Sequence, residues 1–119
     1  AFTEAKEKVT AALAEEKFGI VSEINVQAVL KKKIDKDIRP YTILGACNPH
    51  LASQVIDIEP NAGTLLPCNV LVREESDNSV VVSFMDPHAV LNLINNDGVA
   101  PFAEDVHARL TRVATAIQS

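Results

Sequence analysis

Apolar side chains recur every three or four residues near both ends of the chain, which is the spacing of amphipathic helices. Near the N-terminus the repeat runs from Phe2 to Leu13, with Thr3 as a helix cap and Gly19 as the left-handed residue at which the helix stops. Near the C-terminus one continuous stripe is formed by Phe102, Val106, Leu110, Val113 and Ile117. These spacings predict a helix at each end of the chain, each with one buried face.

Between these helices, alternating or short continuous apolar runs predict four strands. They are expected at 20–27, 41–47, 65–74 and 79–85, with a hairpin turn at 75–78 between the last two. The first run alternates, which predicts a half-buried strand. The second, YTILGAC, predicts a buried strand, and Gly45 inside it indicates a bulge or a close approach of another part of the chain.

Shorter helices are indicated where a capping residue is followed by proline. Asn48-Pro49 is expected to open a helix that ends near Ile58, and Asp86-Pro87 one that ends near Ile94, with Asp86 as a cap. The lysine-rich segment 28–37 is interpreted as a solvated turn of helix rather than a recognition patch, and Arg39-Pro40 ends it.

The order of these elements predicts one α+β domain over residues 1–119. Strands that are adjacent in sequence mostly pair, so we expect a roughly four-stranded, mainly antiparallel sheet with helices packed on one face. If the strands at 41–47 and 65–74 are antiparallel, Cys47 and Cys68 lie at the same end of the sheet. If they are parallel, the two cysteines are a strand length apart.

Composition excludes several classes of partner. Lys and Arg number 11 against 16 Asp and Glu, a net charge of −5, which argues against nonspecific nucleic-acid binding and against docking on an anionic membrane. No apolar run approaches the roughly 20 residues of a membrane span. No leader precedes Ala1, so a cytoplasmic location is the default expectation, with export left open because the N-terminus can have been processed or truncated.

The two cysteines are the strongest candidates for chemistry. Cys47 directly precedes the cap Asn48, and the exposed N–H groups of a helix start favour the thiolate form. Cys68 is likewise followed by an asparagine, Asn69. The pair is compatible with a metal or metallocofactor site, or with a thiol–disulfide oxidoreductase or sulfur carrier that uses Cys47 as nucleophile. Two structural roles are also open: a disulfide, or two buried core residues in an interaction module.

Other candidate groups carry weaker signals. His50 lies three residues beyond Cys47, within reach of a shared ion, but a single Cys-x-x-His more often holds a solvated histidine than a metal ligand. Arg39 and Tyr41 are candidates for binding an anion near the sheet. The sequence holds no phosphate-binding loop, GxSxG or HExxH motif and no dedicated base, so no catalytic residue is assigned and a binding domain is favoured over an enzyme.

Several segments occur together and in order: KFGIVSEINVQ with KKKI, then RPYTILGACNP, LLPCNVLVRE and VVVSFMDP. In these segments the chain resembles the bacterial and archaeal domain-of-unknown-function family 302 over essentially its whole length. The motif residues of that family correspond here to Cys47, Asn48, Pro49, Pro67, Cys68 and Asn69. The resemblance implies a fold similar to half of a TATA-binding protein, helix-first here because the leading strand is absent. It also implies a homodimer, and the role of the family is unassigned.

From these observations we expect a small binding domain whose site is the end of the sheet that carries Cys47 and Cys68. Asn48 and Asn69 are expected to orient the backbone or a ligand there through hydrogen bonds. The expected ligand is a metal, a metallocofactor or a sulfur species.

Overall fold

Helices and strands follow one another along the chain much as the apolar spacing predicts. The computed structural model describes residues 1–91, 93 and 97–118. The helices are α1 (Phe2–Glu15), α2 (Val26–Ile34), α3 (Pro49–Ile58), α4 (Pro87–Leu91) and α5 (Ala100–Ile117), with 3₁₀ turns η1 (Pro60–Leu65) and η2 (Asp97–Val99). The strands are β1 (Gly19–Asn25), β2 (Tyr41–Cys47), β3 (Cys68–Glu74) and β4 (Val80–Phe84).

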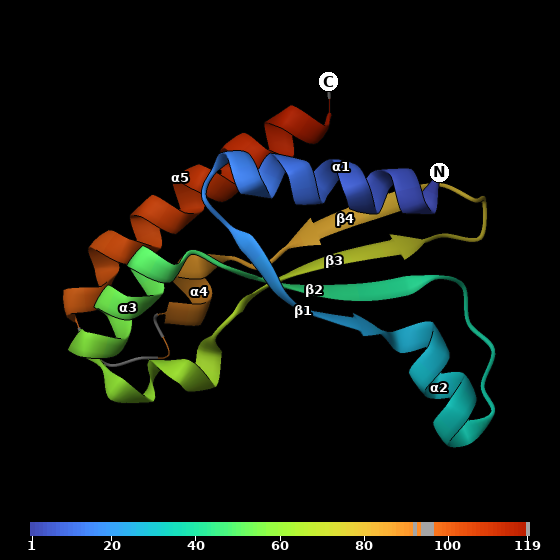
Figure 1. The fold of residues 1–119 in the computed structure, drawn as a ribbon, viewed down its shortest axis with the longest axis horizontal. Coiled ribbons are helices and arrows are strands. Elements are labelled where there is room, and N and C mark those ends of the chain that lie inside the picture. Colours follow the sequence, from blue (N-terminus) through green and yellow to red (C-terminus); the bar gives the residue numbers. More distant parts are fainter. Residues whose placement is uncertain (92, 94–96, 119) are drawn as a thin grey trace.

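The four strands form one sheet in the order β1-β2-β3-β4, and each neighbouring pair is antiparallel. The long helices α1 and α5 lie together over one face of this sheet, whereas α3, η1 and α4 gather at one end (Figure 1). The α+β class and the mainly antiparallel sheet predicted from the sequence are therefore confirmed.

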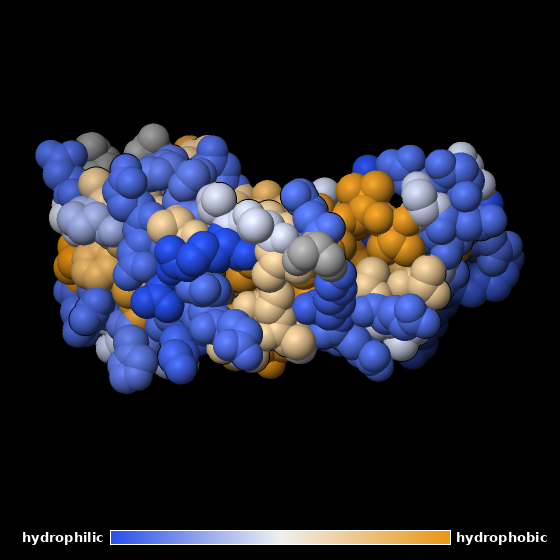
Figure 2. Space-filling model, turned by 90° about the horizontal axis from the view of Figure 1, so that it is seen from above, coloured by the Kyte–Doolittle hydropathy of each residue, from blue (hydrophilic) through white to orange (hydrophobic). Residues whose placement is uncertain are grey.

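The main core lies between the sheet and the two long helices. It is made by Val9 and Leu13 of α1, Val106, Leu110 and Val113 of α5, and Phe18, Leu44, Ala46, Cys68, Val70 and Val72. The predicted apolar stripe of the last helix thus faces the sheet. A second, smaller cluster of Val55, Ala62, Val99 and Ala103 joins α3 to α5. On the face that Figure 2 shows, hydrophilic residues cover most of the surface and hydrophobic residues form limited patches.

The expectation of a half-buried first strand is wrong. Only Ile20 of β1 is partly buried, and Val21 and Ile24 are 64% and 47% exposed. The reason is that β1 is an edge strand, with a register shift between Ile20 and Ser22 that interrupts the alternation. The strand also ends earlier than predicted, because Asn25 caps α2 by accepting a hydrogen bond from the N–H of Ala28 at 3.0 Å.

The C-terminal end of α1 also differs from the prediction. The left-handed residue is Lys17 (φ 69°), not Gly19. The N–H of Lys17 donates to the carbonyl of Ala14, and the N–H of Phe18 donates to that of Leu13, which is the Schellman arrangement. The turn thereby delivers Phe18 into the core beside Leu13, directly before the strand begins at Gly19.

Two further element starts differ from the prediction. Ala1, not Thr3, precedes α1 as its N-cap, without a side-chain hydrogen bond. The third strand begins at Cys68 rather than at 65, because 60–65 forms a 3₁₀ turn and Leu66-Pro67 is a cis peptide.

The two predicted helix caps are confirmed. Asn48 Oδ1 accepts a hydrogen bond from Leu51 N, and Asp86 Oδ1 accepts one from His88 N. The predicted end of the fourth helix at Ile94 falls outside the described residues. Within the described part of the chain, no helix is long and apolar enough to cross a membrane.

Charged groups join the C-terminal end of α1 to α5. Glu16 Oε1 accepts hydrogen bonds from Nε and Nη2 of Arg112 at 3.0 and 2.8 Å, and Arg109 Nη1 donates to the Glu16 carbonyl at 2.8 Å. The hydrogen bond from Arg112 is the largest cause that lowers the pKa of the Glu16 carboxyl below its ordinary value of 4.5. The pair therefore contributes to stability only while Glu16 is ionised.

We expect Arg112→Ala to lower the free energy of unfolding only slightly at neutral pH, because the pair lies at the surface. A carboxyl whose pKa is lowered by folding contributes stability above its unfolded pKa and loses it as the pH falls through the folded value. Urea unfolding of wild type and variant should thus give free energies of unfolding that converge as the pH falls through the lowered pKa of Glu16. A difference that stays constant with pH would instead indicate packing by the arginine stem.

Candidate functional site

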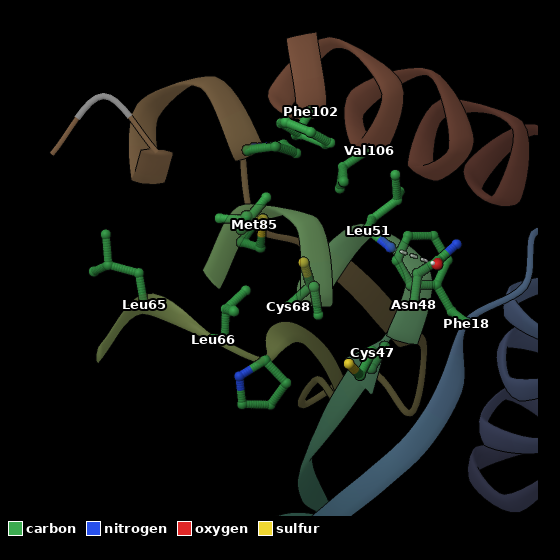
Figure 3. A pocket seen from close by; sticks show the side chains of 15 residues that line it. Phe18, Cys47, Asn48, Leu51, Leu65, Leu66, Cys68, Met85, Phe102 and Val106 are labelled. Carbon is green, nitrogen blue, oxygen red and sulfur yellow. Dashed lines mark hydrogen bonds between the residues drawn. The ribbon is translucent and has the colours of Figure 1, made fainter. Parts of the chain in front are cut away.

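The two cysteines meet at one end of the sheet, as the antiparallel arrangement requires. Ala46 and Cys68 are register partners in the β2–β3 ladder, and Cys47 is the next residue of β2. Because strand side chains alternate, Cys68 shares the helix-covered face with Ala46, and Cys47 leaves the strand on the opposite face. In Figure 3 Cys68 points toward the region of Met85, with Cys47 lower, at the end of its strand. Both are free thiols.

Both cysteines nevertheless line one pocket, because β2 ends at Cys47 and the chain turns there into α3. The other lining residues are Phe18, Ala46, Asn48, Leu51, Ala52, Val55, Leu65, Leu66, Pro67, Met85, Pro87, Phe102 and Val106. None of these carries a charge. The cavity volume open to the centres of water-sized molecules is about 30 Å³, roughly the room that two water molecules need. The pocket is therefore small and apolar.

Burial controls the chemistry of Cys68. It is 7% exposed, and desolvation, with a smaller contribution from Cys47, raises the pKa of its thiol to about 11. At neutral pH the Cys68 sulfur is therefore protonated and a poor nucleophile, since the thiolate is the attacking form. A ligand that binds this sulfur strongly must displace its proton.

The two asparagines of the paired motifs have different places. Asn48 is buried, lines the pocket and uses Oδ1 to cap α3 at Leu51 N, 3.2 Å away (Figure 3). Asn69 is exposed, is the register partner of Gly45 and does not line the pocket. Asn48 thus orients backbone at the site, whereas Asn69 belongs to the uncovered sheet face.

Arg39 and Tyr41 are not brought to the cysteines. Tyr41 begins β2 and Cys47 ends it, a separation of about 20 Å along the strand. Arg39 Nη1 is bound to Glu74 Oε1 at 2.8 Å and to Asn78 Oδ1 at 2.9 Å, beside the hairpin turn. These residues form a structural contact at the opposite end of the sheet.

The histidines also lie apart from the pocket. His50 is exposed at the start of α3 and does not line the cavity. His88 and His107 stack against each other, with ring centroids 5.0 Å apart, a contact that the sequence did not indicate. Among the described residues, no group of three or more His, Cys, Asp and Glu side chains is placed to hold a metal ion. A metal ion bound by the two cysteines would therefore need a further ligand that is not a His, Cys, Asp or Glu side chain.

Sequence reasoning missed most of the apolar residues that complete the pocket. Phe18 reaches it through the turn after α1, Leu51 from α3, and Phe102 from the first turn of α5. Met85 follows β4, and its N–H donates to the Asn69 carbonyl, which sets its backbone beside β3 at the position after Cys68. The one available signal was composition, because Met85 is the single methionine of the chain.

The comparison with known proteins decides the family. The family model described as "Domain of unknown function DUF302" matches residues 1–117. This chain belongs to the DUF302 family. The crystal structure of an uncharacterized conserved DUF302 protein from Bacillus stearothermophilus is similar with a TM-score of 0.85 and 24% sequence identity, covering 99% of this chain and 89% of that one. No curated protein matches this DUF302 chain. The likeness supports the fold and leaves the function of the domain unassigned.

Proposed function

We propose that this DUF302 domain is a binding domain that holds a metal ion or a very small metal- or sulfur-containing ligand between Cys47 and Cys68. The observation that carries the proposal is that both cysteines of the chain are free thiols and line the same uncharged pocket. Thiols are strong ligands for soft metals and for sulfur species once their protons are displaced. The binding site is the pocket between the end of the sheet, α3 and α5.

The size of the pocket limits the size of the ligand that it can hold. A cavity of about 30 Å³ admits a single ion or a group of a few atoms. A larger metallocofactor would require Leu51, Phe102 or the 65–67 segment to move, because these residues close the space. The favoured ligand is therefore a bare ion.

The oxidoreductase alternative has less support. A disulfide requires Cβ atoms about 3.5–4.5 Å apart with suitable direction, which is a stricter condition than two thiols lining one pocket. Cys68 is moreover protonated at neutral pH, which slows thiol exchange. In the interaction-module alternative the cysteines are only core residues, and no ligand is expected. The next experiment distinguishes this alternative from a binding domain.

Anaerobically purified protein should carry metal in a fixed ratio, measured by elemental analysis and by its absorption spectrum. Cys47→Ser and Cys68→Ser should each lose that metal, because each removes one of two thiol ligands. His50→Ala is the matched control and should retain it, since the His50 side chain lies outside the pocket. Metal-free, colourless wild-type protein that also fails to take up added metal would refute the proposal.

The uncovered sheet face supports the homodimer implied by family resemblance, which stays a prediction. Ile24, Ile43 and Leu71 form a row across three strands on the face opposite α1 and α5. All three are at least partly exposed, and an apolar sheet face of this kind is often covered by a second protein surface.

We expect light scattering on a size-exclusion column to give the mass of a dimer, and Leu71→Asp to give that of a monomer. Ile34→Asp, on the exposed end of α2, is the control and should leave the dimer intact. A monomer of wild-type protein at concentrations of about 100 µM would rule out self-association.

A further inference from the structure

All the sulfur atoms of this chain lie around one pocket. The protein has two cysteines and one methionine, and Cys47, Cys68 and Met85 each line the cavity at the end of the sheet. They come from three separate elements: the end of β2, the start of β3 and the residue after β4. The remaining lining residues supply no carboxylate, imidazole or amine.

The backbone of Met85 lies beside β3, opposite the residue that follows Cys68. Its N–H donates to the carbonyl of Asn69, the residue after Cys68, at 3.4 Å, which continues the β3–β4 ladder by one step. Its side chain packs on the core cluster that contains Cys68. In Figure 3 the two side chains lie next to each other near the centre of the pocket, with Cys47 at its lower edge. A thioether and a buried thiol therefore share this space.

This donor set discriminates between metals. Thiolate and thioether sulfurs are soft ligands that select Cu(I), whereas zinc is held by four ligands drawn from cysteine, histidine and carboxylate. The pocket offers three sulfurs and no nitrogen or carboxylate ligand for a tetrahedral zinc.

We propose that the pocket is a Cu(I) site in which Cys47, Cys68 and Met85 supply three sulfur ligands. This inference rests on the proposed function and specifies its ligand. Copper exchanges its previous ligands for bonds to the three sulfurs, and the Cys47 and Cys68 thiols release their two protons to solvent; copper stays monovalent, so no oxidant or reductant is consumed. Phe18, Leu51 and Phe102 line the cavity with apolar surface, which limits the contact of the ion with solvent.

The test is an anaerobic titration of the full chain with Cu(I), in competition with a coloured Cu(I) chelator, and a parallel titration with Zn(II). Wild-type protein should bind one Cu(I) and prefer it to Zn(II). Met85→Leu keeps the volume and apolar character of the side chain and removes only its sulfur. It should weaken Cu(I) binding by at least about tenfold, while its melting temperature stays close to that of wild type. Cys68→Ser should abolish binding, and His50→Ala should leave it unchanged.

The outcomes separate the two proposals. Equal Cu(I) affinity in Met85→Leu and wild type, with loss in Cys68→Ser, would overturn the three-sulfur site and leave a cysteine-based binding site standing. Preference for Zn(II) over Cu(I) would likewise overturn the three-sulfur copper site and leave a cysteine-based binding site standing. Absence of binding for every metal would overturn both proposals. For the loaded protein, X-ray absorption at the copper edge should show sulfur neighbours only, and nitrogen or oxygen neighbours would contradict the assignment.

Discussion

Replacing Phe18 with alanine is expected to lower the free energy of unfolding by about 3–5 kcal/mol. Phe18 is 3% exposed, belongs to the main core and also lines the pocket. Truncation leaves a cavity where α1, the sheet and α3 converge, and it removes the apolar contact with Leu13 that accompanies the turn at Lys17. Urea unfolding followed by circular dichroism measures the loss directly.

Val21→Ala is the matched control for this prediction. Val21 lies three residues further along the chain but is 64% exposed on the edge strand. Its truncation should change stability by no more than about 0.5 kcal/mol. If Phe18→Ala were as mild as Val21→Ala, Phe18 would not occupy the core position described here, and the pocket would lack its wall on that side.

Gly45→Val is expected to destabilise the protein by about 1–3 kcal/mol and to impair ligand retention at the pocket. A Cβ at Gly45 would overlap Ser22 Oγ and lie 2.8 Å from Pro67 Cγ. The serine side chain can rotate away, but the proline ring cannot. The 65–67 segment must therefore move, and it forms part of the pocket wall. Metal content and urea unfolding of the same variant report the two effects.

Gly19→Val provides the comparison, since a Cβ at Gly19 meets nothing within 4 Å. Both glycines lie in strands and both have ordinary backbone angles, so the two variants differ chiefly in the space around the new side chain. Gly19→Val should keep wild-type stability and metal content. Equal stability and equal metal content in the two variants would show that the contact between β2 and Pro67 does not position the pocket.

Local pattern was sufficient to predict the sheet and the meeting of the cysteines. Alternation and turn residues set the hairpin, sequence order set the antiparallel pairing, and together these placed Cys47 and Cys68 at one end. Gly45 was also recognised as a close approach, although the neighbours turned out to be Ser22 and Pro67. These features depend on residues near one another in sequence or on ladder register, both of which leave a visible pattern.

The rest of the site depends on tertiary position. Alternation in β1 resembles that of a half-buried strand, but burial is decided by which strand lies at the edge, and the sequence pattern does not encode this. Met85 and Phe102 reach the cysteines only because β4 and α5 return to the same end of the sheet. Arg39, near in sequence to β2, was by contrast drawn to Glu74 and Asn78 at the opposite end.

Cys47 and Cys68 are proposed to hold one ligand in a shared pocket. Cysteine labelling reports directly on whether both thiols take part. Mass spectrometry of protein treated with N-ethylmaleimide gives a separate alkylation rate for each thiol, with and without one equivalent of Cu(I) under anaerobic conditions. We expect Cu(I) to protect both thiols together, and we expect Cys47→Ser to remove the protection of Cys68. Protection of one thiol alone, or of neither, would contradict a site shared by the two cysteines.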